Sequence, residues 1–219
     1  MRRIVAAAFV SLDGVMQAPG GPDEDPTGGF AFGGWTAPHW DEAMGESMET
    51  LFAQPFDLLL GRKTYEIFAA HWPYVADNPI GETFNRVAKH VVTSSAGPLS
   101  WANSHAINDG IEGVARPKAS DGPDLLIQGS SALYPALLDK GLIDRFQLMI
   151  FPVVLGRGKR LFAEGVRAGA LKLVDSKVSN TGVVIAGYEP AGKVPLGSFA
   201  TQQPSDAELA RREKMKREG

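Results

Sequence analysis

Small hydroxyl and cationic side chains follow three short apolar segments of this 219-residue chain. The segment at residues 58–60 ends in Gly61-Arg62-Lys63-Thr64, and two later segments end in Thr93-Ser94-Ser95 and Gly129-Ser130-Ser131. If these segments are parallel strands, their ends meet at one edge of a sheet, where backbone amides and helix N-termini hold anions. Three such ends predict one extended ligand that carries several phosphates.

The adjacent cations Arg62 and Lys63 favour one kind of dinucleotide. A free ribose diol is usually bound by a carboxylate, whereas an arginine accommodates a 2′-phosphate. The sequence therefore predicts NADPH as the cofactor. Gly61 is expected to let the backbone turn tightly before these cations. A single junction of this kind is also how an ordinary strand-to-helix turn is made, so the prediction depends on all three ends.

Composition excludes several other kinds of chemistry. The chain has no cysteine, which removes disulfides, cysteine-based zinc sites, iron–sulfur clusters and a thiol nucleophile. The four histidines are dispersed without the spacing of metal ligands, so no metal site is expected. A net charge of −3 gives no general attraction to nucleic acid, and no apolar stretch approaches the ~20 residues of a membrane span. The short apolar run after Arg2-Arg3 is interpreted as a first strand of a cytoplasmic protein.

Apolar patterning predicts one α/β domain over residues 1–189 and a polar, charged tail over residues 190–219, mobile or appended. Residues 16–34, rich in glycine and proline, are expected to form a loop beside the site. Parallel strands are predicted at 3–10, 57–60, 90–93, 104–107 and 124–128, and antiparallel strands at 144–155, 172–179 and 182–188. Helices are predicted at 38–52, 63–70, 82–87, 111–115 and 132–140, and another in the tail at 206–218.

Three motifs of the chain resemble the dihydrofolate reductase superfamily, and most closely its riboflavin-biosynthesis reductase branch, the RibD C-terminal domain. They are Ser11-Leu12-Asp13-Gly14, residues 58–66, and the run from Asp144-Arg145 to Phe162. The resemblance covers about residues 3–188. It implies a dihydrofolate reductase-like three-layer α/β/α fold with a mostly parallel sheet, often assembled as a homodimer. It also implies hydride transfer from NADPH to a small heterocycle, either pterin-like or similar to 5-amino-6-(5-phosphoribosylamino)uracil.

The resemblance also implies roles for individual residues. Cofactor phosphates would be held by Arg62, Lys63 and Thr64, which follow Gly61. The adenosine side would be bound by Ser94 and Ser95, which follow Thr93, and the pyrophosphate by Gly129, Ser130 and Ser131. The nicotinamide would be bordered by Ala8 of the first strand, with Asp13, Gly14 and Val15 in the loop after it.

The chain differs from the folate reductase pattern at two positions, and both bear on which substrate it binds. Folate reductases carry an acid in a Trp-x-x-Pro-x-acid pattern, but here Asp41 arrives one residue late in Trp35-Thr36-Ala37-Pro38-His39-Trp40-Asp41. One residue turns a helix by about 100°, so Asp41 need not face the same pocket. Ala88 stands where an arginine would pair with the carboxylate tail of folate, which argues against folate itself as the substrate. The lack of cysteine excludes the zinc deaminase that often accompanies the riboflavin enzyme.

Several alternatives remain open from the sequence. Asp13, Asp41 and His39 are the catalytic candidates, although Asp13 could be a simple turn residue and His39 an exposed helix start. Trp35, Trp40 and Trp72 either line a pocket for a planar substrate or belong to the core. The chain is a reductase of the riboflavin type or a relative adapted to another substrate. The alternative function is an NADP(H)-binding sensor without turnover, and a structural interaction protein explains the three strand ends least well.

Overall fold

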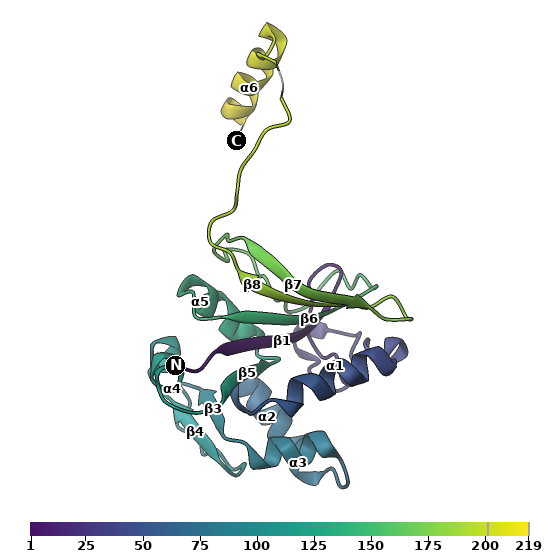
Figure 1. Cartoon of the computed structure of the whole chain (residues 1–219), viewed down its shortest axis with the longest axis vertical. Coiled ribbons are helices and arrows are strands. Elements are labelled where there is room, and N and C mark those ends of the chain that lie inside the picture. Colours follow the sequence, from purple (N-terminus) through teal and green to yellow (C-terminus); the bar gives the residue numbers. More distant parts are fainter. Residues whose placement is uncertain (201, 219) are drawn as a thin grey trace.

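Eight strands form one sheet in the order β4-β3-β2-β5-β1-β6-β8-β7 in the computed structural model, which describes residues 1–200 and 202–218 (Figure 1). Strands β1 to β6 pair with one another in parallel, whereas β8 runs antiparallel to both β6 and β7. This topology confirms the predicted fold class. The strands are β1 Ile4–Ser11, β2 Phe56–Gly61, β3 Lys89–Val92, β4 Ser104–Ile107, β5 Asp124–Gln128, β6 Arg145–Phe151, β7 Leu171–Val178 and β8 Val184–Pro190.

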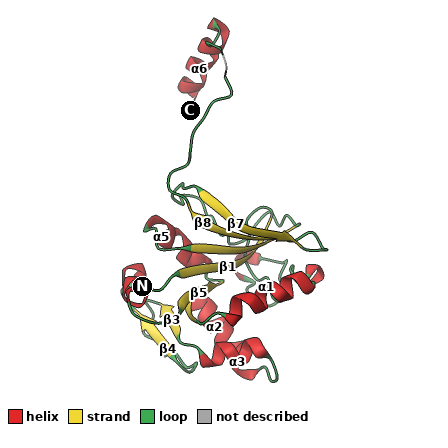
Figure 2. Ribbon diagram, viewed as in Figure 1, coloured by secondary structure: helices red, strands yellow, loops and turns green. Residues whose placement is uncertain are grey.

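Helices cover both faces of this sheet (Figure 2). On β1, Ile4 and Ala6 pack in a core with Tyr134 and Leu137, whereas Val5 packs in a second core with Tyr65 and Phe84. Alternate residues of a strand point to opposite faces, and a parallel sheet needs both faces covered. The helices are α1 Glu42–Ala53, α2 Arg62–His71, α3 Pro79–Arg86, α4 Ala115–Ala119, α5 Tyr134–Asp139 and α6 Asp206–Glu218. None of them is long and apolar enough to cross a membrane.

Some predicted element boundaries are wrong for identifiable reasons. Helix α1 begins at Glu42 and not at residue 38, because the extended Asp41 accepts a hydrogen bond from the Met44 amide at 3.3 Å and ends the preceding turn. Strand β6 stops at Phe151, because Pro152 has no amide hydrogen to continue a ladder. The predicted helix at 132–140 begins as a 3₁₀ turn, and α5 starts only at Tyr134. The helix expected at 111–115 is likewise a 3₁₀ turn before α4.

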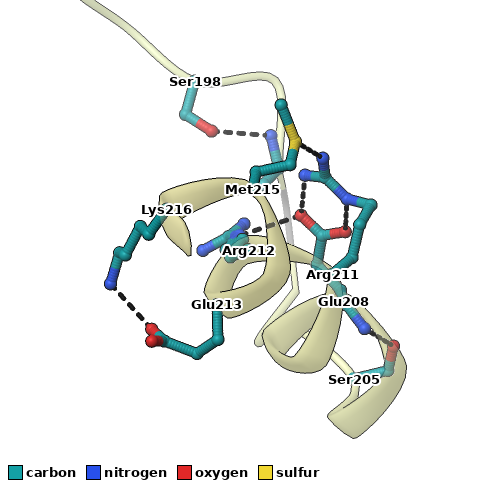
Figure 3. A network of polar contacts seen from close by, with 9 residues as sticks. Ser198, Ser205, Glu208, Arg211, Arg212, Glu213, Met215 and Lys216 are labelled. Atoms are coloured by element: carbon teal, nitrogen blue, oxygen red, sulfur yellow. Dashed lines mark hydrogen bonds and ion pairs between the residues drawn. The ribbon is translucent and has the colours of Figure 1, made fainter. Parts of the chain in front are cut away.

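The C-terminal tail leaves the sheet after β8, and α6 stands away from it (Figure 1). No residue of α6 is buried. Its ion pairs lie within the helix: Glu208 accepts hydrogen bonds from Arg211 and Arg212, and Glu213 accepts one from Lys216 (Figure 3). Exposed ion pairs of this kind contribute little to stability. The division of the chain at residue 189 stays a prediction.

A buried lysine stabilises the turn between α3 and β3. The side chain of Lys89 is fully buried, and its Nζ donates hydrogen bonds of 2.9 Å to the carbonyls of Asn85 and Val87. These carbonyls lie at the C-terminal end of α3, where a cation is favourable. Nζ also lies 4.3 Å from the centre of the Trp101 ring. Desolvation nevertheless lowers the pKa of Lys89 from 10.5 to about 8, against the attraction of Asp57.

We expect Lys89→Met to change how stability depends on pH. Between about pH 8 and 10.5 the unfolded lysine keeps its proton while the folded one loses it. The wild-type protein should therefore gain stability as the pH rises through this range, by on the order of 3 kcal/mol for a pKa lowered from 10.5 to about 8. Lys89→Met removes this contribution. Urea unfolding at several pH values measures how the free energy of unfolding changes with pH. The control is Lys172→Met, because Lys172 is exposed. The same pH dependence in both variants would contradict a lowered pKa of Lys89.

Candidate functional site

A cavity of about 1010 Å³ opens beside the C-terminal ends of β1, β2 and β5. The chain leaves β2 towards β3, on one side of these two strands, and leaves β5 towards β6, on their other side. The loop after β2 and the loop after β5 therefore diverge from a point between the two strands. Ligands of open α/β sheets bind at such points. Ala8, Gly61, Arg62, Lys63, Thr64, Gly129, Ser130 and Ser131 are the predicted cofactor residues that line the cavity.

Two hydrogen bonds join the end of β2 to the end of β5. The Gly61 amide donates to Ser130 Oγ at 2.9 Å, and the Ser130 amide donates to Thr64 Oγ1 at 3.0 Å. Ser130 adopts a left-handed conformation with φ 60°, and the chain then enters a right-handed turn. Backbone of alternating hand makes a concave anion site, and the first turn of α2 presents further amides beside it. The junction therefore suits phosphate.

The glycine that this junction requires is Gly129, and the expectation for Gly61 is wrong. Gly61 has φ −78° and ψ 156°, which any residue adopts, and an added Cβ would make an ordinary 3.6 Å contact with Leu133. Gly129 has φ 75°, and an added Cβ would lie 3.1 Å from Thr64 Cγ2. Glycine at position 129 therefore lets β5 approach α2 closely.

Arg62 connects the cavity to the loop after β3. Its Nε pairs with Glu66 Oε1 at 2.6 Å, and its Nη1 donates to the Gly97 carbonyl at 2.9 Å. Lys63 is exposed beside it. Thr93, Ser94 and Ser95 lie in this loop but do not line the cavity, and Thr93 Oγ1 accepts a hydrogen bond from the Ser95 amide at 3.0 Å. The third predicted strand end thus lies outside the cavity, in the loop that Arg62 contacts.

An apolar wall extends away from the junction, built from α1, α2, α3 and the turns before α1 and after α2. Trp40 and Trp72 belong to it, as two of the three candidate tryptophans, together with Phe52, Ile67, Phe68, Ile80 and Phe84. Trp35 instead donates from Nε1 to the Gln17 carbonyl at 2.8 Å within the core. Trp72 Nε1 and Gln128 Oε1 are buried atoms of cavity-lining residues that have no hydrogen-bond partner within the described part of the chain. Polar groups of a ligand could satisfy such atoms.

The three catalytic candidates do not line this cavity. Asp13 Oδ1 accepts hydrogen bonds from the Ser11 hydroxyl at 2.6 Å and the Leu155 amide at 3.0 Å, and Oδ2 accepts from the Gly156 amide at 2.9 Å. The Ser11 bond, with these amides, outweighs desolvation and lowers the pKa of Asp13 to about 2. Its neighbours Gly14 and Val15 form the same turn outside the cavity, with Gly14 at φ 81° and Val15 fully buried. This carboxylate anchors the 152–160 segment.

Asp41 and His39 also serve local structure. Besides capping α1, Asp41 accepts a 2.9 Å hydrogen bond from the Asn180 amide. Desolvation favours a higher pKa for Asp41, but hydrogen bonds from the surrounding backbone amides lower the pKa below its ordinary value. The His39 carbonyl accepts a 2.6 Å hydrogen bond from Thr181 Oγ1. The imidazole ring of His39 packs edgewise on the Phe151 ring, with 6.0 Å between the ring centres. Their predicted catalytic roles find no support in this geometry.

The loop at 16–34 contributes residues that the sequence did not single out. Glu24 lines the cavity, and its Oε2 accepts a 2.6 Å hydrogen bond from the Gly20 amide. Desolvation raises the pKa of Glu24. Asp25 forms an ion pair with Lys159, and Gln17 Oε1 accepts from the Lys159 amide at 3.0 Å, so the loop is fixed to the 152–160 segment. The acidic run at 23–25 within a glycine-rich loop was the available signal.

The model of the RibD C-terminal domain family matches residues 2–185. The chain belongs to this family. This RibD C-terminal domain protein is 29% identical over 195 residues to the uncharacterized protein YyaP of Bacillus subtilis, an alignment covering 84% of this chain and 92% of YyaP.

Solved structures share the fold of this RibD C-terminal domain protein. A putative riboflavin biosynthesis protein from Shewanella sp. PV-4 superposes with a TM-score of 0.60 at 17% identity, covering 86% of this chain and 99% of that one. Dihydrofolate reductase from Enterococcus faecalis, complexed with NADP(H), gives a TM-score of 0.54 at 14% identity, covering 86% and 96%. The resemblance predicted from the motifs is confirmed.

We expect Thr64→Val to weaken the junction between β2 and β5. Valine keeps the shape of threonine but cannot accept the hydrogen bond of the Ser130 amide. The loss should be about 1–2 kcal/mol in the free energy of unfolding, measured by urea titration. Thr50→Val is the matched control, because the Thr50 hydroxyl is exposed on α1 and bonds only to its own helix at Glu46. Equal stabilities of the two variants would contradict a structural role for Thr64.

Proposed function

We propose that this protein is an NADPH-dependent reductase that transfers a hydride to a small planar heterocycle, pterin-like or 5-amino-6-(5-phosphoribosylamino)uracil-like. The observation that carries the proposal is the Gly61–Ser130–Thr64 junction, an anion-suited backbone that opens into a large cavity with an aromatic wall. Membership of the RibD C-terminal domain family supports a reductase. The NADP(H) complex of the Enterococcus faecalis enzyme supports the cofactor, since that enzyme has the same fold.

The residues of the cavity fit a phosphorylated dinucleotide. The pyrophosphate would lie at Ser130 and Ser131 and the first turn of α2, while Arg62 and Lys63 would attract the additional phosphate. NADPH bound here would supply the hydride. Ala8, small and 4% exposed in the C-terminal half of β1, would leave room for a flat ring against the sheet. The aromatic wall on α2 and α3 would hold the heterocycle and exclude water from it.

A second function, an NADP(H)-binding sensor without turnover, is favoured by one observation. Asp13, Asp41 and His39 all make local structural contacts and none of them lines the cavity. A protein that keeps the phosphate junction but does not use these groups for proton transfer could bind the cofactor and not consume it. Turnover distinguishes this possibility from the reductase.

We also propose that two copies associate through the C-terminal strands. Strand β7 is the edge of the sheet, and Leu173 and Val178 on it are 50% and 68% exposed. An exposed edge strand with apolar side chains is suited to pairing with a second chain.

We expect Arg62→Ala to weaken NADPH binding by about tenfold or more while NADH binding changes little, because the 2′-phosphate is the only difference between these ligands. Quenching of tryptophan fluorescence measures both affinities. Arg116→Ala is the control, since Arg116 is exposed, pairs with Asp109 and does not line the cavity. Equal losses for both dinucleotides would show that Arg62 does not contact the 2′-phosphate.

Oxidation of NADPH tests the reaction itself. We expect absorbance at 340 nm to fall when the protein, NADPH and a member of a panel of pterins and aminopyrimidines are combined. Binding of NADPH without oxidation by any member of the panel would support the sensor. No binding of NADPH would contradict both functions.

A further inference from the structure

The cavity has two ends of different chemical character. Helix α2 lines it from Arg62 to His71, a distance of about 14 Å along the helix axis. The first end carries Arg62 and Lys63 beside the junction of β2 and β5. The second end carries His71 together with Glu24 of the loop, and His71 is close enough to act on the charge of Glu24. A ligand that spans the cavity meets cations at one end and a carboxylate at the other.

Glu24 is held in place at the second end. Its Oε2 accepts the 2.6 Å hydrogen bond from Gly20, and an added Cβ at Gly20 would lie 3.1 Å from the same oxygen. The residue is partly buried, and desolvation, together with the charge of Asp25, raises its pKa against the opposing effects of its hydrogen bonds and His71. Among the described residues, no lysine or arginine forms an ion pair with Glu24. The carboxyl group thus lies in a water-poor position without a strong cation.

Lys159, the cation beside the 16–34 loop, is already paired with an acidic side chain. Lys159 lines the cavity, but its Nζ forms an ion pair with Asp25, which is 9% exposed. A phosphate or carboxylate of a substrate at this end would therefore have to approach Glu24 with only His71 as a possible counter-charge. Like charges at short range in a partly buried site repel more strongly than in water.

On the premise that the protein is the proposed reductase, we propose that Glu24, with His71, selects the substrate by its distal group. The substrate is a planar heterocycle whose distal substituent is uncharged or basic, and heterocycles with a phosphate or carboxylate tail are rejected. This narrows the proposed substrates to rings without an anionic tail. Glu24 acts here as a residue that determines specificity, and no step of the hydride transfer is assigned to it.

The experiment compares ligands that share a ring and differ in the tail. Biopterin and folate form one pair, and 5-amino-6-ribitylaminouracil and its 5′-phosphate form the other. Dissociation constants are measured by calorimetry on the whole chain saturated with NADP⁺, so that no turnover occurs. In the wild-type protein we expect the uncharged member of at least one pair to bind about tenfold or more tightly than its anionic partner.

Glu24→Gln removes the charge and retains a carbonyl oxygen that can accept the Gly20 hydrogen bond. We expect it to tighten binding of the anionic member and to reduce the ratio at least about threefold. Glu49→Gln is the matched control, because Glu49 is exposed on α1 and does not line the cavity. It should leave the ratio unchanged.

Three results would overturn the inference: anionic ligands that bind as tightly as their partners, a ratio that Glu24→Gln does not change, or no binding of either pair to protein that does bind NADP⁺. Failure to bind NADP⁺ at all is a different result. It would refute the proposed function, and the inference would fall with it.

Discussion

The hydrogen bonds between the ends of β2 and β5 hold together the two segments that form the Arg62 end of the cavity. Ser130 takes part in both bonds, because its hydroxyl accepts from Gly61 and its amide donates to Thr64. Its left-handed conformation and the missing side chain at Gly129 make this double contact possible. The position of α2, and with it the apolar wall, follows from this junction.

A second set of polar contacts fixes the loop that closes the cavity. Asp13 binds the amides of Leu155 and Gly156, and Gln17 and Asp25 bind Lys159. The long loop is therefore attached at several points to the 152–160 segment. These contacts hold Glu24 at the cavity wall, whereas a glycine-rich loop without them would leave its position poorly defined. It also explains why Asp13 contributes to structure from a position where catalysis was predicted.

Sequence reasoning placed the ends of β2 and β5 together, as the structure does, because short apolar runs followed by small polar residues have a direct structural meaning in parallel sheets. It assigned the tight turn to Gly61, since the lack of space for a side chain at residue 129 arises from the approach of Thr64, a contact distant in sequence. The same limit applies to Asp41 and Asp13. Their partners, Asn180, Leu155 and Gly156, are more than a hundred residues away in the chain. The structural roles of Asp41 and Asp13 therefore could not be predicted from the sequence around them.

The central claim is that the β2–β5 junction binds the phosphates of NADPH. Hydrogen–deuterium exchange of the whole chain with and without NADPH tests it most directly, because bound phosphates protect the amides that hold them. We expect slower exchange at residues 62–64 and 131–132 on binding of NADPH, with little change in α6. Binding of NADPH that leaves both segments unprotected would contradict it.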